Sequence, residues 1–109
     1  MATFFRNKVI NLVGKVPIEV VETTPTQRAT VIGLSMANLT GSNVLASVTI
    51  RDDTSITGYY IKDIIIPPNS TLKALNGGEK LILAPSNALS VVSSQDDSLD
   101  VILSYVEIT

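Results

Sequence analysis

Hydrophobic and polar residues alternate along most of the chain, in short segments separated by turn-forming residues. Because successive side chains of a strand point to opposite faces, this period of two predicts β-strands with one buried face. The clearest case is residues 43–51, where Val44, Ala46, Val48 and Ile50 are expected to face inward. The other predicted strands cover residues 16–22, 28–39, 59–66, 71–75, 79–83, 88–93 and 99–108.

Two of the longer segments divide their residues between two faces. In residues 28–39 one face carries Ile32, Leu34 and Met36, the other carries Val31, Gly33 and Ser35, and Gly33 marks a bulge or a close backbone approach. In residues 99–108 one face is expected to carry Leu99, Val101, Leu103 and Tyr105.

Residues 59–66 are rich in β-branched and aromatic side chains and stop at a pair of prolines. This composition predicts a central strand inside the protein. Ile61, Ile64 and Ile66 cannot share one face at a period of two. The segment is therefore expected to contain a bulge near residues 62–63, or to be buried on both faces.

Two short connections predict hairpins. Thr40, Gly41 and Ser42 have hairpin length, so residues 28–39 and 43–51 are expected to pair with each other. Asn76, Gly77 and Gly78 tolerate positive φ at little cost and predict a tight turn between residues 71–75 and 79–83.

Together these patterns predict an all-β fold of eight or nine short strands with no long segment of helical period. The expected architecture is a two-sheet antiparallel β-sandwich of jelly-roll or immunoglobulin-like kind, with a small closed barrel as the alternative. Residues 1–14 are interpreted as an N-terminal arm or edge strand, and residues 15–109 as the sandwich domain. The apolar residues of the arm are expected to lie either on the domain's own sheet or against a neighbouring subunit.

Composition narrows the possible functions. The 109 residues contain no histidine and no cysteine, so Ser-His-Asp and Cys-His catalysis and thiolate metal sites have no residues to use. The carboxylates of Glu19, Glu22, Asp63 and Glu79 show no spacing typical of a glycosidase pair. We expect a non-enzymatic protein without a cofactor.

Charge and hydropathy indicate which classes of partner to expect. The formal net charge is −2, and the cations are scattered, which argues against a nucleic-acid partner. No segment approaches the roughly 20 apolar residues of a membrane span, so no membrane partner is expected. Asp52, Asp53, Asp96, Asp97 and Asp100 could offer oxygens to Ca²⁺, but Asp is common in turns for its own backbone hydrogen bonds. No metal site is therefore predicted.

Five segments carry a resemblance to a known family. They are residues 4–10, 31–35, 64–70, 77–83 and 101–107. In this order they resemble small β-sandwich virion proteins of tailed bacteriophages, notably those that infect cyanobacteria. The resemblance implies a non-enzymatic, homo-oligomeric part of the virion, such as a capsid decoration, neck or tail accessory subunit. Its partners would be other virion proteins of the capsid, portal, neck or tail.

The arm supplies the candidate partner-binding residues. Phe4, Phe5, Val9 and Ile10 are expected to anchor the protein, while Arg6 and Lys8 contact an acidic partner surface. The alternative is that Phe4 and Phe5 complete the protein's own core. A second functional hypothesis is a carbohydrate- or receptor-binding module of a tail fibre or baseplate, which would use loops such as residues 52–58 or 69–71.

Overall fold

The computed structural model describes residues 2–109, with side chains omitted for residues 76–79. The described chain forms eight strands and no helix: β1 (Thr3–Val13), β2 (Ile18–Glu22), β3 (Arg28–Asn38), β4 (Val44–Arg51), β5 (Thr57–Ile66), β6 (Thr71–Leu83), β7 (Ala88–Ser93) and β8 (Leu99–Ile108). Within this part of the chain there is accordingly no helix that could span a membrane.

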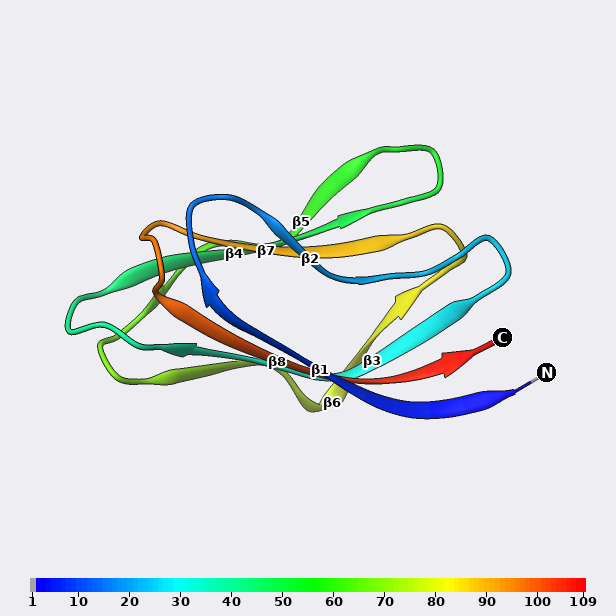
Figure 1. The fold of residues 1–109 in the computed structure, drawn as a ribbon, viewed down its shortest axis with the longest axis horizontal. Helices are drawn as coiled ribbons and strands as arrows, with labels where there is room; N and C mark the ends of the chain where they lie inside the picture. The colour runs from blue at the N-terminus through cyan, green and yellow to red at the C-terminus, as the bar shows by residue number, and fades with distance from the viewer. Residues whose placement is uncertain (1) are drawn as a thin grey trace.

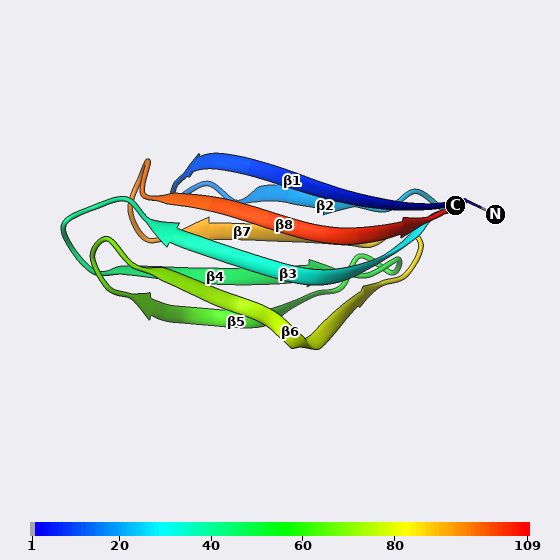
Figure 2. The ribbon, with the colours of Figure 1, turned by 90° about the horizontal axis from the view of Figure 1, so that it is seen from below.

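The strands form two four-stranded antiparallel sheets packed face to face (Figures 1 and 2). Sheet A has the order β1-β8-β3-β6, and sheet B has the order β2-β7-β4-β5. Only β4 and β5 are consecutive strands that pair with each other. This order, in which the chain crosses repeatedly between the sheets, is the jelly-roll arrangement. The predicted all-β sandwich is confirmed, and the jelly-roll alternative is the one that the topology matches.

The core lies between the inner faces of the two sheets. It follows the predicted alternation in β4, where Val44, Ala46 and Val48 are fully buried, and in β8. Its largest fully buried side chains are Leu34, Met36, Ile66, Leu83, Leu89, Leu99 and Leu103. Burying such aliphatic side chains, at about 1.5–3 kcal/mol each, is the main stabilising contribution in a chain without disulfides.

The predicted hairpin between β3 and β4 was wrong, because these strands lie in different sheets. Asn38, which is 3% exposed at the end of β3, organises the crossing. Its Nδ2 donates to the carbonyl oxygens of Ser42 (2.8 Å), Ile66 (2.9 Å) and Pro67 (3.1 Å). Its Oδ1 accepts hydrogen bonds from the backbone N–H and hydroxyl of Thr40, both at 2.8 Å. The amide therefore joins the β3–β4 crossing to the β5–β6 corner.

Residues 59–66 do not form a central strand. They belong to β5, an edge strand of sheet B on which Tyr59 and Ile65 are 60% and 59% exposed. A β-branched run indicates a strand but does not fix its place in the sheet. The predicted bulge is confirmed: the register shifts opposite Ser47, and Asp63 has a φ of 49°. The Asp63 N–H donates to the Ser47 hydroxyl at 2.9 Å.

The predicted hairpin in residues 71–83 was also wrong. The side chains of residues 76–79, which include the predicted turn at residues 76–78 and the candidate carboxylate of Glu79, lie outside the description. The flanking segments both pair with β3 and not with each other. Leu75 pairs with Leu34, and Leu81 pairs with Val31. The register shifts between these pairs, and β6 bends sharply near its middle (Figure 2). The glycine-rich segment thus coincides with a shift of register within one strand, and not with a turn between two strands.

The predicted bulge at Gly33 is confirmed by a register shift between Val31 and Gly33. The shift changes which residues of β3 face the core. Val31 joins Leu34 and Met36 in the interior, whereas Ile32, which was predicted to share their face, is 36% exposed on the other side.

Candidate functional site

Strand β1 forms one edge of sheet A and pairs only with β8. From Thr3 to Ile10 it follows β8 without interruption, and the register shifts only between Ile10 and Val13. In Figure 2 the strand runs along the border of its sheet, beside β8. The N-terminal segment is thus an ordered edge strand over eight consecutive paired residues.

The free edge of β1 carries backbone groups with a defined direction. Ala2 and Thr109 exchange both of their backbone hydrogen bonds, at 3.2 and 2.9 Å. Because such pairs alternate along an antiparallel ladder, the even-numbered residues that follow direct their N–H and C=O groups toward β8. The same groups of Thr3, Phe5, Asn7 and Val9 therefore point away from the sheet.

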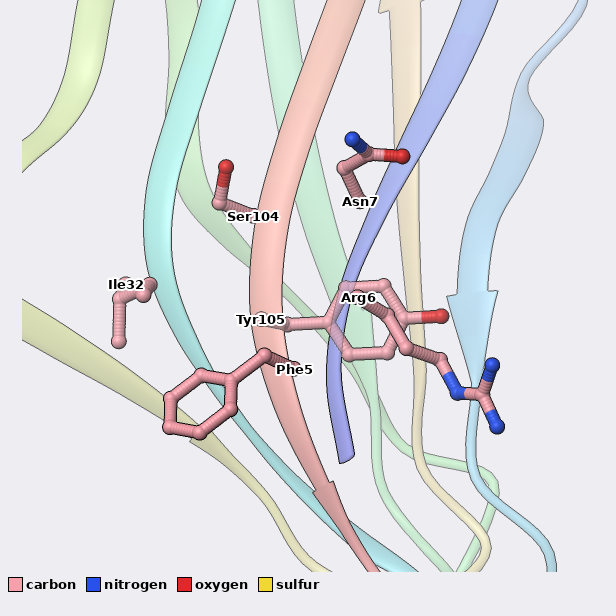
Figure 3. A pocket seen from close by; sticks show the side chains of 6 residues that line it. All are labelled: Phe5, Arg6, Asn7, Ile32, Ser104 and Tyr105. Carbon is pink, nitrogen blue, oxygen red and sulfur yellow. The ribbon is translucent and has the colours of Figure 1, made fainter. Parts of the chain in front are cut away.

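The side chains of these odd-numbered residues lie on the outer face of sheet A. Phe5 is 82% exposed and Val9 is 62% exposed. Val9 pairs with Ile102 of β8, which is 49% exposed. The ring of Phe5 lies across β8 toward Ile32, and Ser104 lies further along β8 (Figure 3). Together they border an open, shallow depression of about 550 Å³. We call Phe5, Val9, Ile32 and Ile102 the outer apolar strip.

The even-numbered residues of β1 have different surroundings. Arg6 Nε donates to Glu107 Oε2 at 2.5 Å, and its guanidinium lies 4.9 Å from the centroid of the Phe4 ring. Phe4 is 42% exposed, and Lys8 is exposed as well. Ile10 is half-buried and packs against the core. The six predicted residues therefore share one strand but divide between its two faces.

The other end of β1 is tied to the loop between β7 and β8. Val13 is fully buried, and its carbonyl oxygen accepts a hydrogen bond from Ser98 N–H at 3.0 Å. Leu12 has a φ of 55°, and its N–H donates to Asp100 Oδ1 at 3.1 Å. The Lys15 N–H donates to Asp96 Oδ1, also at 3.1 Å. This end of the strand belongs to the domain itself.

These contacts also show what two of the aspartates considered as cation ligands bind in the fold. Asp96 and Asp100 accept backbone hydrogen bonds from Lys15 and Leu12 at the end of β1, and not from a turn of their own. In the β4–β5 turn, hydrogen bonds from the Thr54 hydroxyl and the Ile56 N–H lower the pKa of Asp52. No group of three or more acidic residues able to hold a metal occurs among the described residues.

Of the candidate catalytic carboxylates whose side chains are described, the fold holds Glu19 and Glu22 near one another. Both bind Arg51, with Nη1 3.3 Å from Glu19 Oε2 and Nη2 2.9 Å from Glu22 Oε2. All three side chains are about half exposed, so this ion-pair group contributes little to stability.

The three other sheet edges are irregular. Strand β2 has five residues, follows Pro17 and shifts its register between Glu19 and Val21. Strand β5 contains the Asp63 bulge, and β6 shifts twice along β3. Bulges, prolines and short length prevent an edge from pairing with another chain. Among the four edges, β1 has the longest regular run.

The sequence pattern did not predict that Ile32 and Ile102 join this surface. Ile102 alternates with Val101 and Leu103, so the sequence indicates that its side chain points outward. The sequence does not indicate which residues of the neighbouring strands lie beside it. Ile32 reaches the outer face only because of the bulge at Gly33.

No known protein family and no curated protein sequence matches the chain. Solved structures do share its fold. The first is a subunit of Bacillus endospore appendages, described as disulfide-linked pili, with a TM-score of 0.57, 6% identity, and coverage of 98% of this chain and 88% of that one. The second comes from the capsid of Helicobacter pylori bacteriophage KHP30, with a TM-score of 0.54, 9% identity, and coverage of 100% and 89%.

A third similar structure comes from the T13 particle of the infectious bursal disease virus. It has a TM-score of 0.53 and 12% identity, and the match covers 96% of this chain but only 30% of the viral one. At these identities the likeness establishes the fold: this jelly-roll occurs in subunits of viral capsids and of pili.

Proposed function

We propose that this protein is a non-enzymatic structural subunit of a phage virion, attached in several copies to the capsid, neck or tail through β1. The observation that carries the proposal is a jelly-roll whose first strand is a regular, unprotected edge with exposed apolar side chains. Proteins usually cover or interrupt such an edge, because it offers a template for another strand. An edge that is left open is suited to assembly.

The shared fold supports assembly into a particle. The similar structures come from a phage capsid, a viral capsid and a pilus, which are all built from repeated subunits. The pilus type of linkage does not suit these residues: the pili are described as disulfide-linked, and the 109 residues contain no cysteine. A virion subunit held by non-covalent contacts is therefore the preferred proposal.

Strand β1 offers two kinds of contact to a partner. Its outward backbone groups can extend the sheet, and Phe5 and Val9 can be buried beside the added strand. Covering Phe5 and Val9 removes apolar surface from water, at about 25 cal/mol per Å². Lys8 and the Arg6–Glu107 pair lie on the other face of the strand, where they favour a partner surface of complementary charge.

The alternative of a carbohydrate-binding tail module is less well supported. Tyr59 is the exposed aromatic residue near the proposed loops, but Lys62 Nζ lies over its ring, 5.0 Å from the centroid. Asp52 Oδ1 accepts three hydrogen bonds from its own turn. A glycan array with the purified protein tests this alternative, which requires saturable binding to at least one sugar.

The proposal is tested on particles. Virions produced from the genome that encodes this chain are purified by density gradient, and the chain is quantified by mass spectrometry. We expect it to sediment with the particles in several copies per virion. A variant with Phe5→Ser and Val9→Thr, which replaces the two apolar side chains on the outer face of β1, should be depleted from particles, whereas the matched β5 variant Ile65→Ser should not. Absence of the unmodified chain from the particles would overturn the proposal.

A further inference from the structure

The geometry of β1 restricts how a second strand can add to it. The outward N–H and C=O groups belong to Thr3, Phe5, Asn7 and Val9, so the added strand must present its own outward groups opposite these residues. A second copy of β1 carries the same groups at the same spacing. Two copies can therefore pair antiparallel across a two-fold axis, which is the commonest symmetry of homo-oligomers.

Charge selects among the possible two-fold registers. Placing Arg6 opposite the partner's Arg6 brings two cations together, and placing Asn7 opposite the partner's Asn7 brings Arg6 opposite the partner's Lys8. Like charges directly opposite each other destabilise a strand pair. Placing Phe5 opposite the partner's Phe5 avoids both conflicts, because Lys8 then faces the partner's Ala2. Moving the two-fold axis further toward the N-terminus also separates the charges, but it reduces the number of residues that pair between the two strands.

This register also places favourable groups together. Arg6 faces the partner's Phe4, so the contact that the guanidinium already makes with Phe4 inside one chain can be repeated between chains. The two Phe5 side chains meet at the axis on the outer face of the sheet. The outer apolar strips of both copies then become continuous, and about six backbone hydrogen bonds form between the strands.

We infer that β1 pairs with β1 of a second copy across a two-fold axis, with Phe5 opposite the partner's Phe5. The two copies of sheet A would then form one continuous sheet of eight strands, twice the number in one copy. This inference rests on the proposed function, since it names the first partner of the assembling edge. It identifies a symmetric dimer as the unit that enters the particle. Since the backbone edges of both β1 strands are then paired with each other, the dimer meets the other virion proteins through the outer apolar strips beside this pair.

Cysteines introduced one at a time test the pairing. A disulfide can form only at the introduced residue, because the unmodified chain contains no cysteine. In the inferred register the two copies of residue 5 form a hydrogen-bonded pair, whose Cα separation of about 5.5 Å suits a disulfide. We expect Phe5→Cys to give covalent dimer under mild oxidation, and Arg6→Cys and Asn7→Cys to give at least tenfold less. The double variant Thr3→Cys/Asn7→Cys, which keeps Phe5, should also form dimer, whereas each of its single variants should not.

The outcomes separate this inference from the proposed function. Predominant cross-linking through Arg6→Cys or Asn7→Cys would overturn the register, and the absence of cross-linking in all variants would overturn the pairing. Light scattering after size-exclusion chromatography of the unmodified chain should show a dimer. Asn7→Pro removes one outward N–H and should give a folded monomer, whereas the control Asn7→Ala should stay dimeric. A monomeric unmodified chain that still sediments with virions would overturn the dimer and leave the proposed function standing.

Discussion

Asn38 gives the most stringent test of how the two sheets are joined. Its side chain is 3% exposed and makes five hydrogen bonds that hold the β3–β4 crossing against the β5–β6 corner. Asn38→Ala removes all five and leaves the Ile66 carbonyl, whose bond to Asn38 is buried, without this donor. A typical hydrogen bond contributes about 1 kcal/mol net, and an unsatisfied buried group costs about 1–3 kcal/mol. We expect the free energy of unfolding to fall by about 3–5 kcal/mol.

The isosteric variant Asn38→Asp distinguishes the donor from the acceptor side of this residue. It keeps the acceptor for Thr40 but places a carboxylate oxygen against the carbonyl oxygens of Ser42, Ile66 and Pro67. Since a buried charge facing acceptors is more costly than a missing amide, we expect Asn38→Asp to be less stable at pH 7 than Asn38→Ala.

Urea unfolding followed by circular dichroism measures both effects. Asn11→Ala on the exposed part of β1 is the matched control and should change the free energy of unfolding by less than about 0.5 kcal/mol. The slope of the free energy against urea should stay constant, so that the midpoint reports stability. A loss below about 1 kcal/mol for Asn38→Ala, or an Asn38→Asp variant more stable than Asn38→Ala, would refute the role assigned to this amide.

Two further predictions concern a turn and the N-terminal strand. Since hydrogen bonds from Thr54 and Ile56 lower the pKa of Asp52 in the folded state, its carboxylate stabilises the fold at neutral pH, and this contribution is lost as the pH falls below about 4. Carbon-detected NMR titration should show a higher Asp52 pKa in Thr54→Val than in the unmodified chain, and equal values would contradict the assignment. Deleting residues 2–9 should leave a folded protein by circular dichroism, whereas deleting residues 2–14 should abolish folding because it removes the buried Val13; a folded product of the longer deletion would show that the end of β1 is dispensable.

The alternation of side chains predicted the fold class, most strand positions and much of the core. In β8 the residues predicted to share one face include Leu99, Val101 and Leu103, which are fully buried. The same alternation did not predict which strands pair with each other. The short connection at residues 39–43 fits a hairpin by length, but the tertiary contacts of Asn38 turn it into a crossing between sheets.

The candidate site was predictable only in part. The apolar and basic residues of the N-terminal segment were visible in the sequence, but their division between two faces depends on the register with β8. That Phe5 is exposed while Ile10 packs against the core follows from this register. The outer apolar strip also needs the bulge at Gly33, which changes the direction of Ile32. A local pattern contains neither piece of information.

The strand order has a consequence for how the protein forms. Strand β1 has its sheet neighbour in β8, and β2 has its neighbour in β7, so most pairs join segments far apart in the sequence. Closing such long loops before any contact is gained makes folding slow. During synthesis β1 leaves the ribosome long before residues 99–108 do, and until then both of its edges are unpaired. The nascent chain therefore exposes Phe5 and Val9 on a strand without a neighbour, and we expect chaperone binding to be concentrated on this segment until β8 has been made.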